Sequence, residues 1–109
     1  MYNLLRTTDL TGITEMGEFD VPPAIIVKRF GPPGAGDGYK ISGQYVFVDT
    51  NGEPFVVHDW KSTTLWDGGL GTPEDFWASE EPQEMTVSTR DLDTEVFVAW
   101  FLRELEEES

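Results

Sequence analysis

The amino-acid sequence predicts a small α+β domain, in which an antiparallel sheet of about four or five strands carries a C-terminal helix on one face. Three stretches support this fold class. Residues 40–62 hold two apolar runs around an Asn-Gly dipeptide, residues 72–79 begin with typical helix-start residues, and residues 94–107 are rich in apolar side chains and lack proline. A chain of 109 residues without a linker-like segment is expected to form one domain over residues 1–109.

The segment 40–62 is predicted to be a β-hairpin. Asn-Gly is the dipeptide best suited to the two positive φ angles of a type I′ turn, and apolar residues flank it on both sides. A two-residue loop would place Val48 opposite Phe55 and Val46 opposite Val57. Both faces of such a hairpin are apolar, so we expect it to be covered on both sides or to lie centrally in the sheet.

Shorter signals mark the other elements. The β-branched run over residues 24–30, bounded by proline and glycine, favours a buried strand. Thr72 followed by Pro73 and two acidic residues is a typical helix start, and Pro82 ends that short helix. Residues 84–88 alternate between polar and apolar side chains, which predicts an edge strand.

The last element is predicted to be a helix from Thr94 to about Glu107, with Asp91 or Asp93 as its N-cap. Residues 96–102 are all apolar, and at about 100° per residue they cover most of the helix circumference. We expect this helix to be buried within the domain, which needs a core. The alternative is a structural or assembly subunit that docks on a neighbour, or forms a homo-oligomer, through this helix.

Negative charge is the most pronounced feature of the composition. The chain has 21 acidic and 7 basic residues, for a net charge of −14, and residues 67–109 alone hold 13 acidic and 2 basic residues. Such a field repels nucleic-acid backbones and anionic membranes, so direct binding to either is not expected. A basic protein surface is the expected partner, although acidity can also serve solubility alone or reflect adaptation to high salt.

The composition also indicates a cellular compartment. The chain contains no cysteine, which excludes a disulfide scaffold and thiolate metal ligands. No apolar run approaches the ~20 residues that span a bilayer, and the N-terminus lacks a basic start followed by an apolar stretch. We therefore expect a cytoplasmic protein without a cofactor.

The leading functional hypothesis is a non-enzymatic binding protein that acts through its acidic C-terminal half on a basic partner, such as a nucleic-acid-binding enzyme. Its sharpest form is inhibition by mimicry of nucleic acid, in which carboxylates take the places of phosphates. Small inhibitors from phages and mobile elements are similar to this chain in size and charge. Trp66 and Trp77 flank a glycine-rich segment and are expected to face the partner. The predicted contact carboxylates are Glu74, Asp75, Glu80, Glu81, Glu84, Asp91, Asp93 and Glu95.

One short motif indicates an enzyme instead. Asp49, followed ten residues later by Asp59-Trp60-Lys61, resembles the metal-binding core of the PD-(D/E)XK nuclease superfamily. The resemblance implies a Mg²⁺ ion held by the two carboxylates and a lysine that activates water. However, the predicted hairpin register separates the two aspartates by about 17 Å at ~3.4 Å per residue. The 7 basic residues of the whole chain are also few for a protein that approaches phosphate.

Two further features favour structural roles. His58 is the only histidine, and no nucleophile elbow accompanies it, so a packed and hydrogen-bonded side chain is expected. Residues 31–38 contain four glycines and two prolines. They lack the lysine and the following helix of a phosphate-binding loop, which predicts a surface connection between strands.

Overall fold

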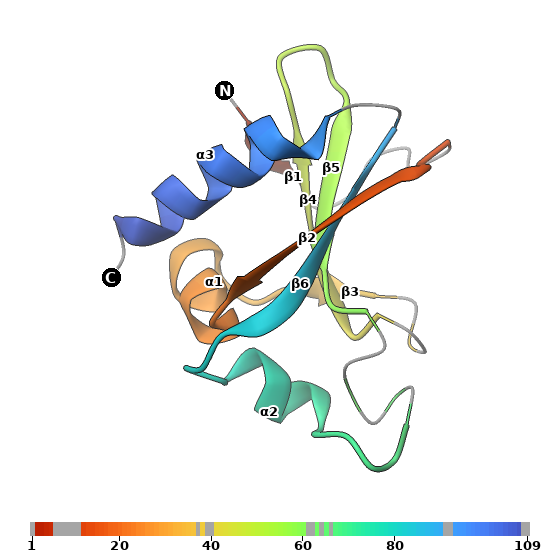
Figure 1. The fold of residues 1–109 in the computed structure, drawn as a ribbon, viewed down its shortest axis with the longest axis vertical. Coiled ribbons are helices and arrows are strands. Elements are labelled where there is room, and N and C mark those ends of the chain that lie inside the picture. Colours follow the sequence, from red (N-terminus) through yellow and green to blue (C-terminus); the bar gives the residue numbers. More distant parts are fainter. Residues whose placement is uncertain are drawn as a thin grey trace.

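The computed structural model describes residues 2–5, 12–36, 38, 41–60, 63, 65, 67–90 and 93–107. In chain order the elements are β1 (Asn3–Leu5), β2 (Glu15–Val21), α1 (Pro23–Phe30), β3 (Gly34–Ala35), β4 (Gly43–Val48), β5 (Pro54–His58), α2 (Pro73–Trp77), β6 (Gln83–Thr89) and α3 (Thr94–Glu106). The described strand pairs are antiparallel, in the order β1-β4-β5-β6-β2, and β3 pairs with β4 on the same edge as β1 (Figure 1). The predicted α+β fold class is confirmed.

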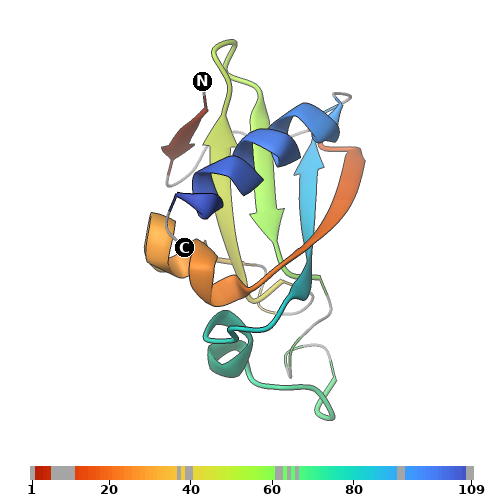
Figure 2. The ribbon, with the colours of Figure 1, turned by 60° about the vertical axis from the view of Figure 1, so that its left-hand side comes forward.

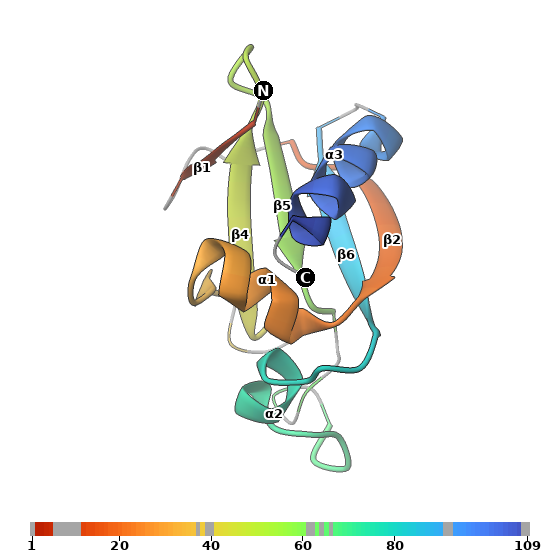
Figure 3. The same cartoon turned by 90° about the vertical axis from the view of Figure 1, so that its left-hand side faces the viewer.

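Helices α1 and α3 lie on one face of the sheet, and α2 lies near one end of it (Figures 1, 2 and 3). We call the face that carries α1 and α3 the inner face and the opposite one the outer face. The core forms between the inner face and the helices. It includes Tyr45, Phe47, Phe55, Val57, Met85 and Val87 from the strands and Ile26, Phe97, Phe101 and Leu105 from α1 and α3.

The hairpin formed by β4 and β5 lies centrally in the sheet, as predicted, but its register differs from the prediction by one residue. Val48 pairs with Pro54 instead of Phe55, and Phe47 pairs with Phe55. Because side chains alternate between the two faces, this shift changes which residues lie together. Phe47 and Phe55 therefore share the inner face, and both enter the core.

The loop of the hairpin explains the shift, because it holds three residues, 50–52, instead of two. The Asp49 carboxylate accepts hydrogen bonds from the backbone N–H groups of Asn51 (2.8 Å) and Glu53 (3.0 Å). The N–H of Gly52 donates to the Asp49 carbonyl at 3.1 Å, and Gly52 has a φ of +80°, which glycine adopts without strain. Asp49 thus stabilises a three-residue turn that competes with the type I′ turn.

Helix α1 stands where the sequence analysis predicted a buried strand over residues 24–30, so that prediction is wrong. Pro22 is the N-cap and Pro23 is the first helical residue, a position at which the missing proline N–H removes no helical hydrogen bond. The helix ends at Phe30, and the C-cap residue Gly31 has a φ of +85°, which glycine adopts without strain. Packing overrides the strand propensity of the β-branched run, because Ile26 is completely buried in the core.

Strand β6 lies inside the sheet, so the prediction of an edge strand over residues 84–88 is wrong. It pairs with β5 on one side and with β2 on the other. Strand β2 pairs with β6 over seven residue pairs and forms the rim of the described sheet (Figures 2 and 3). The sequence signal for β2 was weak because residues 1–20 are mostly polar and contain two glycines.

Helices α2 and α3 begin as predicted. The Thr72 hydroxyl caps α2 by accepting a hydrogen bond from the Asp75 N–H at 3.1 Å. The Asp93 carboxylate caps α3 by accepting a hydrogen bond from the Glu95 N–H at 2.8 Å. Both caps satisfy backbone donors that have no partner within the helix.

Helix α3 turns its aromatic side toward the sheet. Phe97, Phe101 and Leu105 recur every fourth residue and are buried. The ring of Phe97 stacks on that of Phe55, with 4.9 Å between centroids. Val96 lies on the other side of the helix and is 62% exposed. The sequence predicts that this helix is buried within the domain, and the structure shows this burial for the side that carries Phe97 and Phe101.

Replacing Phe101 with alanine is expected to lower the free energy of unfolding by about 3–5 kcal/mol, because the buried ring leaves a cavity. The ring contacts those of Phe19, Phe30 and Phe47. Urea unfolding followed by tryptophan fluorescence measures the loss. Val96→Ala on the same helix is the control, with an expected change of less than about 0.5 kcal/mol. Equal losses in the two variants would contradict the assignment of the buried side.

Candidate functional site

The predicted contact carboxylates lie near the two ends of β6 and do not form a single group. The group near the start of β6 comprises Glu74, Asp75, Glu80, Glu81 and Glu84, and the group beyond its end comprises Asp93 and Glu95. All of these residues are exposed. At ~3.4 Å per residue, β6 separates the two groups by about 20 Å, and Figure 1 shows α2 and the start of α3 at opposite ends of the strand. Asp91 and Trp66 lie outside the described residues.

Trp77 is a core residue, which removes it from the predicted partner-facing surface. Its side chain is 9% exposed, and its ring packs edge-on against Tyr45 with 5.9 Å between centroids. The indole N–H donates a hydrogen bond to the Ser42 hydroxyl at 3.0 Å. Trp77 therefore fixes the end of α2 to the region just before β4.

Asp59 is a completely buried carboxylate that anchors the same region. Its Oδ1 atom accepts hydrogen bonds from the backbone N–H groups of Ser42 (2.8 Å) and Gly43 (3.2 Å). Its Oδ2 atom accepts a hydrogen bond from the Ser42 hydroxyl at 2.8 Å. Three donors thus compensate for the loss of hydration, and Asp59, Ser42 and Trp77 form one connected network.

The nuclease-like motif does not converge on a metal site. Asp49 follows β4 at the hairpin loop, whereas Asp59 follows β5 at the other end of the hairpin. Each carboxylate is engaged by nearby backbone donors. Within the described ranges, no three His, Cys, Asp or Glu side chains are grouped so that they could hold a metal ion. Lys61, the third member of the motif, lies outside these ranges.

His58 is packed and hydrogen-bonded, as expected. Its Nδ1 atom lies 2.7 Å from the Asp59 carbonyl oxygen, and its Nε2 atom lies 2.9 Å from the Ser88 hydroxyl. Because a carbonyl oxygen only accepts, Nδ1 carries a proton and donates to Asp59, and Nε2 shares a hydrogen bond with the Ser88 hydroxyl. Ser88 is 7% exposed and lies within the paired strand β6, so the pair satisfies two buried polar groups in the sheet.

A group of carboxylates that no sequence pattern indicates lies on the outer face, at the rim of the described sheet. Asp20 of β2 lies directly opposite Glu84 of β6, and Glu18 lies diagonally across from Glu84. All three side chains are exposed. We call Glu18, Asp20 and Glu84 the acidic edge. Like charges at such short range destabilise a pair of strands.

The pKa of Glu84 reports this repulsion. The charge of Glu18 is the main cause that raises the pKa of Glu84 above its ordinary value, followed by loss of hydration. A side-chain hydrogen bond with Glu18 and the charge of Asp20 add to the effect. A neighbouring cation would relieve the repulsion within the acidic edge.

A small apolar pocket lies on the inner side of the same rim. It has a volume of about 220 Å³ and is formed by the end of β2, the start of α1 and the last turns of α3. Its lining residues are Val21, Pro22, Ile25, Leu102, Leu105 and Glu106. We call it the rim pocket. Strand β2 therefore has carboxylates on one face and an apolar hollow beside the other.

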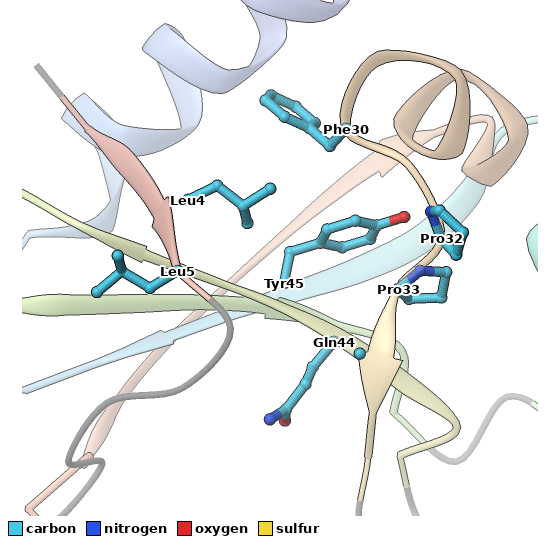
Figure 4. Close-up of a pocket in the computed structure, with 8 residues that line it drawn as sticks. Leu4, Leu5, Phe30, Pro32, Pro33, Gln44 and Tyr45 are labelled. Atoms are coloured by element: carbon cyan, nitrogen blue, oxygen red, sulfur yellow. The ribbon is translucent and has the colours of Figure 1, made fainter.

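A larger cavity of about 620 Å³ lies at the opposite rim of the sheet, beside β1 and β3 (Figure 4). Its lining residues are Leu4, Leu5, Phe30, Pro32, Pro33, Gly34, Gln44 and Tyr45. Figure 4 shows Gln44 pointing away from the rings of Phe30 and Tyr45. The Tyr45 hydroxyl donates a hydrogen bond to the Gly31 carbonyl at 2.6 Å, and burial raises the pKa of Tyr45. The burial and the hydrogen bond both favour the protonated hydroxyl, through which Tyr45 links β4 to the C-cap of α1.

Replacing Asp59 with asparagine is expected to lower the free energy of unfolding by about 2–3 kcal/mol, because the amide turns an NH₂ group toward buried donors. Urea unfolding measures this loss. Asp67→Asn is the matched control, since the exposed Asp67 carboxylate accepts a hydrogen bond from the Gly69 N–H at 2.9 Å. The control should change stability by less than about 0.5 kcal/mol. A similar effect in both variants would show that Asp59 is not an anchor.

Replacing Glu84 with glutamine is expected to raise the melting temperature at neutral pH and low salt. Because the folded state raises the pKa of Glu84, the folded protein binds this proton more tightly than the unfolded chain does. The residue therefore destabilises the fold increasingly as the pH rises from ~4.3, the ordinary pKa of glutamate, through the folded-state pKa. Melting curves at several pH values should show the advantage of Glu84→Gln growing over this window.

Added salt should reduce that advantage, because it screens the repulsion among exposed charges. Glu81→Gln is the control, since Glu81 is exposed and precedes the paired part of β6. If the rise in melting temperature of Glu84→Gln did not vary with pH or salt, repulsion between carboxylates could not be its cause.

The described helices include none that is both long enough and apolar enough to cross a bilayer. In comparisons with known proteins, no protein-family model matches the sequence. No curated protein matches it either.

Proposed function

We propose that this chain is a non-enzymatic acidic binding protein that recognises a basic surface on another protein. The acidic edge carries this proposal. Glu18, Asp20 and Glu84 are held next to one another on two paired strands, although their charges repel. A partner that supplies lysine or arginine side chains at this place would remove the repulsion and gain charge-assisted hydrogen bonds.

The surroundings of the acidic edge add to the negative field. Glu80 and Glu81 precede β6, and Glu74 and Asp75 lie in the first turn of α2 at the same end of the strand. The described ion pairs lie elsewhere, since Arg29 pairs with Glu104 at 3.4 Å and Arg90 pairs with Glu53 at 3.5 Å. The net charge of −14 would also attract a basic partner over long range and favour fast association.

The most specific version of this proposed function is inhibition by nucleic-acid mimicry, of the kind that phages and mobile elements use against host enzymes. Glu18 and Asp20 project from alternate positions of one strand, about 7 Å apart. Carboxylates at fixed spacings could occupy the phosphate sites of a nucleic-acid-binding enzyme. The chain itself would not bind nucleic acid, and the lack of cysteine suits a reducing cytoplasm.

The test is capture of partners from a host lysate by the tagged protein at low and at high salt, followed by mass spectrometry. We expect a basic protein that is retained at low salt and released as salt rises. A variant that combines Glu18→Gln, Asp20→Asn and Glu84→Gln should lose this capture. A second variant with Asp93→Asn and Glu95→Gln, at the far end of β6, should keep it. Failure to retain any basic protein, or equal capture by both variants, would refute the proposed site.

A further inference from the structure

We propose that β2 is a docking edge, onto which an extended segment of the partner adds as a further antiparallel or parallel strand. The segment would alternate basic and apolar residues. This inference rests on the proposed function, because it specifies how the basic partner binds at the acidic edge. Three observations carry it: the side of β2 on which no described strand pairs, the charges on its outer face and the rim pocket on its inner side.

The first observation is the position of β2 in the sheet. The strand spans the seven residues Glu15–Val21 and pairs with β6 on one side. On its other side Figures 2 and 3 show no further element of the described chain. Such an edge presents backbone N–H and C=O groups in the spacing that an added strand requires. At seven residues, β2 is long enough to pair with a peptide over several hydrogen bonds.

The second observation is the charge on the outer face of β2. Glu18 and Asp20 stand at alternate positions, so both project from the same face, and Glu84 of β6 adds a third carboxylate. The side chains of an added strand would alternate between the same two faces. Those on the outer face would lie directly beside Glu18 and Asp20, and lysine or arginine at these positions would form cross-strand ion pairs.

The third observation is the apolar character of the inner side. Phe19 packs against Phe101, with 5.7 Å between ring centroids, and Val21 lines the rim pocket together with Leu102 and Leu105. An inner side chain of an added strand near Val21 would enter this pocket, whose volume of about 220 Å³ suits a branched aliphatic side chain. Burial of that side chain would contribute affinity that salt does not screen.

Together these features specify the occupant. Basic residues must alternate with apolar ones, because a strand offers its neighbours two faces of different chemistry. A second copy of this chain fits poorly at the same edge. If the β2 strands of two copies paired, Glu18 and Asp20 of one copy would lie near the same residues of the other. This would add to the repulsion that already exists among the carboxylates of each acidic edge.

The test measures binding of fluorescent peptides to the intact protein by anisotropy. The probe is an alternating Lys-Val peptide of about ten residues, a typical upper length for a strand. A peptide of the same composition with its lysines and valines in two blocks is the matched control. We expect the alternating peptide to bind about tenfold more tightly, because only its pattern matches both faces of β2. Amide chemical shifts should change along residues 15–21.

Protein variants test the two faces separately. Glu18→Gln with Glu84→Gln should weaken binding of the alternating peptide about three- to tenfold and reduce its salt dependence. Leu102→Ala should weaken it about tenfold without changing the salt dependence, since it removes an apolar wall of the rim pocket. Val96→Ala, an exposed apolar residue of the same helix outside the pocket, should leave binding unchanged.

Backbone pairing is tested by methylation of every second peptide nitrogen. One of the two possible sets of methyl groups removes the donors that face β2 and should abolish binding, whereas the other set should be tolerated. Equal binding of the alternating and block peptides, with no difference between the two methylated sets, would overturn strand addition. So would concentration-dependent dimerisation through residues 15–21 in the absence of peptide.

These outcomes separate this inference from the proposed function. If the alternating and block peptides bind equally well while capture from the lysate still depends on the acidic edge, the protein binds a basic surface without adding a strand. If neither a basic protein nor a basic peptide binds, the proposed function and the docking edge both fail.

Discussion

The register of the β4–β5 hairpin is the constraint on which the rest of the structure depends. The Asp49 carboxylate holds a three-residue loop, and that loop sets which residues of the two strands lie opposite each other. In this register Phe47 and Phe55 share the inner face and meet the aromatic side of α3. A shift of one residue would turn one of the two rings to the outer face and remove the surface on which α3 packs.

Packing on the inner face also explains how the sheet can tolerate the acidic edge. Phe19 and Val21 of β2 lie in or against the core, and the same strand carries Glu18 and Asp20 on its outer face. Burial of apolar side chains contributes more free energy than exposed carboxylates lose by repulsion. The carboxylates are thus held at a fixed spacing by forces on the other side of the strand, which is a useful property in a binding surface.

Features that depend on neighbouring residues in the chain could be predicted, and features that depend on strand pairing could not. Thr72 and Asp93 mark the starts of α2 and α3 through local hydrogen bonds, so their residue types suffice. Residues 24–30 have strand propensity, and only their packing in the fold makes them helical. The acidic edge joins Glu84 to residues more than sixty positions earlier, and nothing local to either strand indicates that they pair.

The two rims of the sheet differ in a way that bears on association. At the rim beside β4, two short strands of three and two residues, β1 and β3, occupy the edge. Short edge strands offer little backbone to another chain. The β2 rim is seven residues long and carries like charges instead. Those charges oppose pairing between two copies of the chain, and they favour a strand that brings basic side chains. In the proposed complex the same carboxylates would disfavour pairing with a second copy and favour a basic partner, which would be a reason for a small domain to retain a repulsive cluster at the rim of its described sheet.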